Sequence, residues 1–169
     1  MNKKNILVTG GAGYIGSILV HDLLNQEYEV TVLDNFLFGQ LTLTEVCKND
    51  KFDVVRGDTR DTKLLEKMIP NFDIIIPLAA LVGAPMCKLD ELGAVSINRT
   101  AVEEIIKIAA KDQLILMPVS NSGYGVGEKG KFCDETSPLN PISLYGRTKC
   151  DAEEEVTKAK NYICFRLAT

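Results

Sequence analysis

The chain has 169 residues, of which 46% are hydrophobic and 25% are charged, and its formal net charge is -4 at pH 7. This length suits one domain with a sizeable core and is short for two. The acidic balance argues against a protein that binds nucleic acid without regard to sequence, because such a protein needs a basic surface. A small anionic ligand is not excluded, because backbone amides can bind phosphate without net positive charge.

Cysteine and histidine usage argues against a metal centre. The single histidine, His21, falls in a segment of helical pattern, where a surface position is expected. The five cysteines are odd in number and form no CxxC pair: Cys47, Cys87, Cys133, Cys150 and Cys164. We therefore expect reduced thiols, no zinc site and no disulfide framework, as in a cytoplasmic protein.

No apolar run is suited to a membrane. The first, at 6–8, ends at once in two glycines and is too short for a signal peptide. The run at 74–86 is interrupted by Pro77, Gly83 and Pro85. We therefore expect a cytoplasmic protein without a membrane-spanning segment.

Short apolar runs alternate with longer segments of helical period along the whole chain. Strands are predicted at 5–9, 29–33, 52–56, 73–76, 114–119 and 162–167. Helices are predicted at 14–25, 62–68, 92–111 and 143–160, and 36–49 is predicted to be a loop with a poorer helix. Most of the strands are apolar throughout, which is typical of parallel strands covered on both faces. The pattern predicts one α/β domain over 1–169, a doubly wound parallel sheet of Rossmann type with helices on both faces.

The first motif is TGGAGYIGS at 9–17, which follows the first strand and opens the first helix. Gly10 would allow a tight turn, Gly13 would let a pyrophosphate approach the backbone, and Gly16 would let the helix pack against the strand. Tyr14 and Ile15 complete the predicted contact. The helix N-terminus then offers free N–H groups to phosphate. The alternative is a plain glycine-rich turn, which the strand–helix context disfavours.

Asp34 and Asn35 follow the second strand. A carboxylate at this place can accept hydrogen bonds from both hydroxyls of an adenosine ribose and repels a 2′-phosphate, so it favours NAD over NADP. The alternative is a turn in which Asp34 caps the next segment. The position at a strand end favours the cofactor role.

Two more segments end predicted strands. In RGDTRD at 56–61, Asp58, with Thr59 beside it, could accept from the adenine amino group, whereas Asp61 and Thr62 are expected only to cap a helix. In the next strand, small residues would let a flat cofactor pass over the sheet edge: Leu78, Ala79 and Ala80.

Ser120, Tyr145 and Lys149 are the candidate catalytic residues. Tyr145 and Lys149 are four apart in a predicted helix and share one face, and Ser120 follows the fifth strand. The Lys149 ammonium and a cationic nicotinamide would lower the pKa of the phenol, making it a base for a sugar hydroxyl. Ser120 would hold the same oxygen. A Tyr–Lys pair alone arises by chance in many helices, but here it joins three cofactor signals on one sheet edge.

With these motifs in order, the chain resembles the extended short-chain dehydrogenases/reductases, in their NAD-dependent epimerase/dehydratase branch, typified by UDP-glucose 4-epimerase. The resemblance also rests on Asn98 in INRT and on DETSPLNP at 134–141. It implies that Tyr145, Lys149 and Ser120 are catalytic, that Tyr145, Lys149 and Asn98 also contact NAD, and that Ser120, Asn121 and Ser122 contact a nucleotide sugar oxidised first at C4.

The chain departs from this family at three places. Pro77 stands where the family often has His, which is expected to affect only local packing. Asn121 and Ser122 stand where 4,6-dehydratases carry an Asp-Glu pair, so an epimerase is favoured over a dehydratase. The family continues past the equivalent of Thr169 with a substrate lobe, so we expect this piece to lack that lobe and to be inactive alone.

Alternatives remain open for function and assembly. Decarboxylation or reduction through a 4-keto sugar, and a non-catalytic NAD-binding module, are the other readings of the function. The resemblance implies a homodimer built on the helices at 92–111 and 143–160, against which stands a purely intramolecular role for their apolar residues: Val95, Ile105, Ile106, Ile108, Ala152, Val156 and Ala159.

Overall fold

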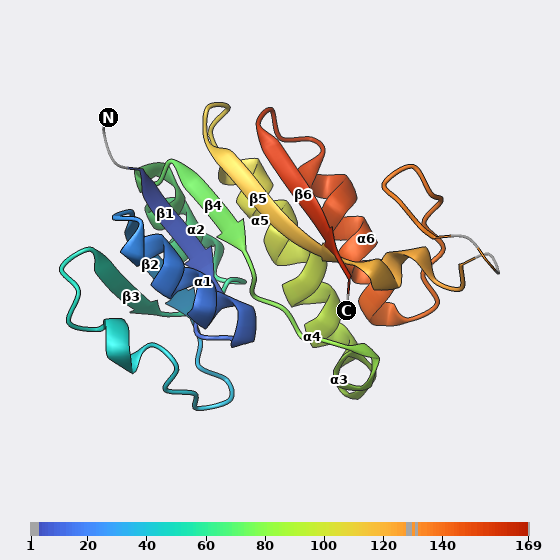
Figure 1. Cartoon of the computed structure of the whole chain (residues 1–169), viewed down its shortest axis with the longest axis horizontal. Coiled ribbons are helices and arrows are strands. Elements are labelled where there is room, and N and C mark those ends of the chain that lie inside the picture. The colour runs from blue at the N-terminus through green and yellow to red at the C-terminus, as the bar shows by residue number, and fades with distance from the viewer. Residues whose placement is uncertain (1–3, 128–129, 131, 169) are drawn as a thin grey trace.

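A computed structural model of the chain describes residues 4–127, 130 and 132–168. In this part a six-stranded sheet has the order β3-β2-β1-β4-β5-β6, and every neighbouring pair is parallel. The strands are β1 (Asn5–Thr9), β2 (Glu29–Asp34), β3 (Phe52–Arg56), β4 (Ile74–Pro77), β5 (Leu114–Ser120) and β6 (Tyr162–Leu167). All arrowheads point to the lower side of Figure 1, so the carboxyl ends share one edge. The predicted Rossmann-type doubly wound sheet is confirmed.

The helices between the strands are α1 (Tyr14–Asn25), α2 (Thr62–Met68), α3 (Ala84–Leu89), α4 (Glu91–Val95), α5 (Ala101–Ile108) and α6 (Leu144–Val156). Short turns of 3₁₀-helix, labelled η1, η2 and η4, lie at Thr44–Val46, Ile69–Asn71 and Asn121–Tyr124. The single helix predicted at 92–111 is wrong in detail. It consists of α4, one turn of π-helix at Ser96–Thr100 (η3), and α5. Helix α3 was not predicted, because Gly83 and Pro85 read as loop residues although proline suits a first helical turn.

The core has two layers because successive residues of a strand face opposite sides of the sheet. Leu7 of β1 packs with residues of α2, α5 and α6, whereas Ile6 and Val8 pack on the other face with α1 and the η1 turn. All three are at most 1% exposed. β1 is thereby buried on both faces, and the residues at its end are held firmly.

The edge strand β6 is an exception to the expectation that most strands are covered on both faces. Alternate residues of β6, namely Ile163, Phe165 and Leu167, are about 40–50% exposed. α6 covers the opposite face, on which Cys164 packs into the core. Although the run at 162–167 is largely apolar, the described residues cover only one face of this strand.

The apolar residues weighed for a dimer contact mostly serve the core. Ile105, Ala152 and Val156 are at most 1% exposed, and Ile106, Ile108 and Ala159 pack against the same cluster. Val95 differs, at 37% exposed. These contacts support the intramolecular role, and the homodimer stays a prediction.

Arg166 of β6 joins three segments that precede it in the chain. Its Nε donates to both carboxylate oxygens of Glu153 on α6, at 2.9 and 3.1 Å. Its Nη1 donates to the Tyr124 hydroxyl at 3.3 Å and to the Glu135 carbonyl at 3.2 Å. The guanidinium also lies 5.3 Å from the centre of the Tyr124 ring. One side chain thus ties the segment after β5 to helix α6.

We predict that Arg166→Leu lowers the free energy of unfolding by about 3 kcal/mol, because it leaves Glu153 largely buried without its partner. Urea unfolding followed by circular dichroism would measure the change. The double variant Arg166→Leu/Glu153→Leu should regain most of the loss, and Arg147→Leu at an exposed position should change little. Equal losses in the single and double variants would contradict this account.

Candidate active site and cofactor cavity

A cavity of about 350 Å³ lies at the carboxyl edge of the sheet. The predicted cofactor residues that line it are Gly10, Gly13, Tyr14, Ile15, Gly16, Asp34, Asn35, Asp58, Thr59, Leu78, Ala79 and Ala80. They come from the segments after four different strands. The cavity therefore brings together the motifs that the sequence placed on one rim. Asn98, Tyr145 and Lys149 lie outside its lining.

The three glycines of the first motif have different reasons to be glycine. Gly10 has φ +69°, and a Cβ there would lie 2.5 Å from the Ala79 nitrogen. A Cβ on Gly16 would lie 2.6 Å from the Gly11 Cα, so α1 packs against the glycine loop too closely to leave room for a side chain at this position. On Gly13 the nearest atom would be the Gly10 oxygen at 3.2 Å, which is close but less crowded than the surroundings of Gly10 and Gly16. Gly13 also lines the cavity, where a ligand would pass.

Asp34 caps a turn, as one of the two roles considered for it requires, and its contact with ribose stays a prediction. Its side chain is buried, with Oδ2 accepting from the Ala12 N–H at 3.0 Å and Oδ1 from the Phe36 N–H at 2.8 Å. The bond from Phe36 closes a turn of the kind expected where Asp is followed by Asn. The bond from Ala12 ties β2 to the glycine loop. Each carboxylate oxygen can accept a further bond, so the carboxylate is held in place and can still receive hydroxyl donors.

Asp58 lies at the end of the segment after β3. Hydrogen bonds from Arg60, which outweigh the opposing effect of burial, lower the pKa of Asp58 to about 2. Asn35 Nδ2 also donates to it at 3.5 Å. Asp61 caps α2 by accepting from the Leu64 N–H at 3.1 Å, as predicted.

Gln40 was missed by the sequence analysis. It lines the cavity, and its Oε1 atom is buried without a hydrogen-bond partner among the described residues. Thr42 holds the same loop by donating to the Ala12 carbonyl at 2.7 Å. A buried acceptor without a donor is costly, so Gln40 suits a ligand hydroxyl or amino group. Nothing in the local sequence marks it, because only the folded loop brings it to the cavity.

Asn98 connects the cavity to the catalytic helix. Its Oδ1 accepts from the Leu81 N–H at 2.8 Å, and its Nδ2 donates to the Leu81 carbonyl at 2.9 Å and to Thr148 Oγ1 at 3.3 Å. It is 1% exposed and lies in the π-helical turn. The side chain that the resemblance assigned to NAD therefore contacts the loop that lines the cavity, and direct contact with NAD stays a prediction.

Ser120 ends β5, and Asn121 and Ser122 begin the η4 turn. The Ser120 Oγ accepts from the Ser122 N–H at 3.2 Å and from the Ser122 hydroxyl at 2.8 Å. Its own proton remains available to another oxygen. A hydrogen bond from Ser120 acts to lower the pKa of Tyr145, and a shared catalytic role for the two side chains stays a prediction.

Tyr145 and Lys149 lie on one face of α6, one turn apart. Burial raises the pKa of Tyr145 above its usual value, and the Ser120 hydrogen bond opposes this only in part. The thiol of Cys87 acts in the same direction as burial. Lys149 is not among the groups that shift this pKa in the structure, and the prediction was made for Lys149 acting together with a cationic nicotinamide. A lowered pKa stays a prediction for the protein with a cationic nicotinamide bound.

Lys149 is 6% exposed and has no carboxylate partner among the described residues. Burial lowers the pKa of this ammonium to about 8. A buried cation of this kind is costly to the fold and is typical of a functional site.

The parallel sheet, the glycine loop before α1 and the cavity at the strand ends define a Rossmann-type dinucleotide-binding domain. The family model for the NAD dependent epimerase/dehydratase family matches residues 6–169. The chain belongs to this family, and its cofactor is NAD.

Three similar proteins illustrate the match. The bifunctional UDP-glucose 4-epimerase and UDP-xylose 4-epimerase 3 of Arabidopsis thaliana is 33% identical over 168 residues, which cover 90% of this chain and 46% of that protein. The UDP-glucose 4-epimerase of Lactobacillus helveticus is 31% identical over 153 residues, covering 88% and 45%. The structure of UDP-glucuronic acid 4-epimerase from Bacillus cereus, in complex with UDP-glucuronic acid and NAD, has a TM-score of 0.84 at 27% identity and covers 96% and 55%. This chain thus spans about half the length of the proteins it matches.

Two further features concern metals and membranes. In the described part of the chain, no group of three or more His, Cys, Asp or Glu side chains is arranged to hold a metal ion. Within the same residues, none of the helices has the length and apolar character that crossing a bilayer requires.

We predict that Gly13→Ala weakens NAD binding at least tenfold, because the added methyl group projects toward the pyrophosphate path in surroundings less crowded than those of Gly16. The free energy of unfolding should change by less than about 1 kcal/mol. Gly16→Ala should instead destabilise the fold by about 2 kcal/mol, since its methyl group meets backbone. Calorimetric titration with NAD and urea unfolding would separate the two effects. Unchanged NAD affinity in Gly13→Ala would contradict the assignment.

We predict that Lys149→Met stabilises the NAD-free protein by about 3 kcal/mol at pH 7, because the folded state holds this proton less tightly than the unfolded state. The cost of burying the lysine is complete below about pH 8 and declines as the pH rises to about 10.5, where the unfolded chain also loses the proton. Unfolding curves at pH 7, 8, 9 and 10 should show the gap closing. Lys111→Met at an exposed position is the control, and a gap independent of pH would refute the explanation.

Proposed function

We propose that this chain forms the NAD-binding and hydride-transfer part of a nucleotide-sugar 4-epimerase. The observation that carries the proposal is the placement of Tyr145 and Lys149 one turn apart on one face of α6, which packs beside the end of β5 that carries Ser120. The names of the similar proteins support a UDP-sugar as the substrate class. The part of the relatives that this chain does not span would complete the substrate pocket.

The cavity suits NAD on three independent grounds. The first turn of α1 presents free N–H groups beside glycine backbone, where a pyrophosphate would bind. Asp34 offers a fixed carboxylate for ribose hydroxyls and would repel a 2′-phosphate. Gln40 supplies a buried acceptor that lacks a donor. When bound, NAD would supply a hydride acceptor for C4 of the sugar and return the hydride later.

The residues of this chain would then transfer the proton of the sugar C4 hydroxyl and stabilise the charge that its transfer creates. Tyr145 takes the proton from the sugar C4 hydroxyl as the hydride leaves, and it returns the proton when the hydride comes back. Ser120 donates a hydrogen bond to the oxygen that carries the developing charge. Lys149, held charged below about pH 8, favours the ionised phenol electrostatically.

The choice of epimerase over dehydratase rests on Asn121 and Ser122. Elimination of water from a 4-keto sugar needs an acid and a base in addition to Tyr145. Neither an amide nor an ordinary hydroxyl supplies them at neutral pH. Epimerisation needs only that the keto sugar turns over before the hydride returns.

The test uses a chain extended to the length of the relatives, incubated with UDP-glucose and with UDP-glucuronic acid. We predict that Tyr145→Phe lowers the rate of 4-epimerisation at least a thousandfold, because it removes the group proposed to take the proton. NAD affinity should change less than threefold, since the phenol oxygen acts on the sugar.

The result has three informative outcomes. Epimerised product from the unaltered chain, lost in Tyr145→Phe, would support the proposal. Decarboxylated or reduced sugar would identify another 4-keto reaction. Tight NAD binding without turnover of any UDP-sugar would favour a non-catalytic NAD-binding module and overturn the proposed epimerase.

A further inference from the structure

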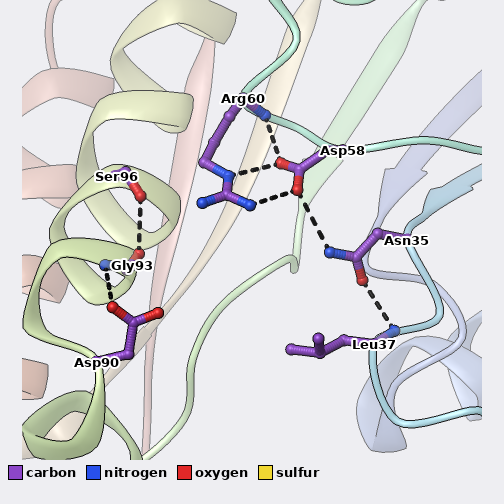
Figure 2. Close-up of polar contacts among 7 residues, drawn as sticks. All are labelled: Asn35, Leu37, Asp58, Arg60, Asp90, Gly93 and Ser96. Atoms are coloured by element: carbon purple, nitrogen blue, oxygen red, sulfur yellow. Dashed lines mark hydrogen bonds and ion pairs between the residues drawn. The ribbon is translucent and has the colours of Figure 1, made fainter.

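Arg60 forms a forked contact with a residue of the NAD cavity. Its Nε donates to Asp58 Oδ1 at 2.9 Å and its Nη2 donates to Asp58 Oδ2 at 2.6 Å, while its backbone N–H donates to Oδ1 at 2.9 Å. Figure 2 shows the planar guanidinium facing both carboxylate oxygens, with Asn35 on the far side of Asp58. Such a two-point contact fixes the plane of the carboxylate as well as its position.

The contact contributes little to the stability of the fold. The side chains of Arg60 and Asp58 are 46% and 31% exposed, and ion pairs at such exposure contribute at most about 1 kcal/mol. Arg60 is only two residues from Asp58, so the bonds tie no distant segments together. The consequence of the contact is therefore local: it determines how the Asp58 carboxylate is presented.

Arg60 itself is held between two carboxylates. Figure 2 places it between Asp58 and the start of α4, where Asp90 accepts from the Gly93 N–H at 2.7 Å. The charges of Asp58 and Asp90 both raise the pKa of Arg60, Asp58 more strongly. The guanidinium thus stays charged, and its forked hydrogen bonds go to Asp58.

Asp58 faces the cavity between these fixed partners. Arg60 occupies the outer lone pairs of both oxygens, and Asn35 donates to Oδ2 at 3.5 Å. Oδ1 already accepts two bonds from Arg60, whereas Oδ2 accepts one close bond from Arg60 and one at 3.5 Å from Asn35, so Oδ2 is the oxygen at which an incoming donor can replace the long Asn35 contact. The carboxylate's freedom to turn away is removed, and its low pKa keeps it without a proton, so it can only accept.

We propose that Arg60 is a positioning residue that fixes Asp58 as an acceptor for the amino group of adenine, so that the cavity selects a 6-amino purine over a 6-oxo purine. This rests on the proposed function, in which the cavity binds NAD, and on the expectation from the sequence that Asp58 meets the adenine amino group. A 6-oxo group presents lone pairs to the carboxylate where the 6-amino group presents hydrogens, and an acceptor that cannot rotate or protonate cannot adapt to it.

The experiment compares the binding of NAD and of nicotinamide hypoxanthine dinucleotide by calorimetry. The unaltered protein should bind NAD about tenfold more tightly, as one charge-assisted hydrogen bond gained or lost implies. Arg60→Gln removes the charge and the fork, and the preference should fall below about threefold through weaker NAD binding. Arg60→Lys keeps the charge without the fork and should give an intermediate preference. Lys63→Gln, a nearby exposed change, should leave the preference as it was.

The outcomes separate the inference from the function on which it rests. Equal binding of both dinucleotides by the unaltered protein would overturn the adenine role of Asp58. A preference that persists in Arg60→Gln would overturn the role of Arg60 while leaving Asp58 in place. Should Arg60→Gln fail to fold, Arg60→Lys carries the test, and an unchanged preference in that variant overturns the proposal.

Discussion

The carboxamide of Asn98 is the contact on which the site depends. It binds the N–H and the carbonyl of Leu81 at once and donates to Thr148. Leu81 belongs to the segment that lines the cavity, and Thr148 directly precedes Lys149 on α6. The cavity and the candidate catalytic helix come from distant parts of the chain, and this one buried side chain joins them.

The backbone around Asn98 is adapted to that contact. A π-helical turn carries one residue more than an α-helical turn, so it changes which side chains point inward. Here it turns Asn98 to the interior while α4 and α5 each bury their own apolar face. Both polar ends of the amide have partners, so its burial does not leave an unpaired group. Irregular helix geometry at this point is thus part of how the site is assembled.

Properties set by local sequence could be predicted, and properties set by contacts across space could not. The strands were placed to within a residue, because an apolar run between turn residues determines a buried parallel strand. The glycine loop and Asp34 followed from their position at strand ends. Gln40 escaped prediction because a loop of irregular backbone brings it to the cavity, and the Arg60–Asp58 fork because charged neighbours in a loop look alike in sequence. The burial of Tyr145, which raises its pKa in the structure, could not be predicted because it depends on α3, a helix that the sequence did not reveal.

The thiol of Cys87 makes this arrangement observable. It is fully buried, donates to the Leu81 carbonyl at 3.3 Å, and burial raises its pKa, so it is chemically quiet while the Asn98 contact holds. Cys47, by contrast, is exposed. A thiol reagent would therefore modify Cys47 at once and Cys87 only when the junction beside the active site opens. The rate of the slow reaction reports how often the two halves of the site separate, without any label having to be introduced.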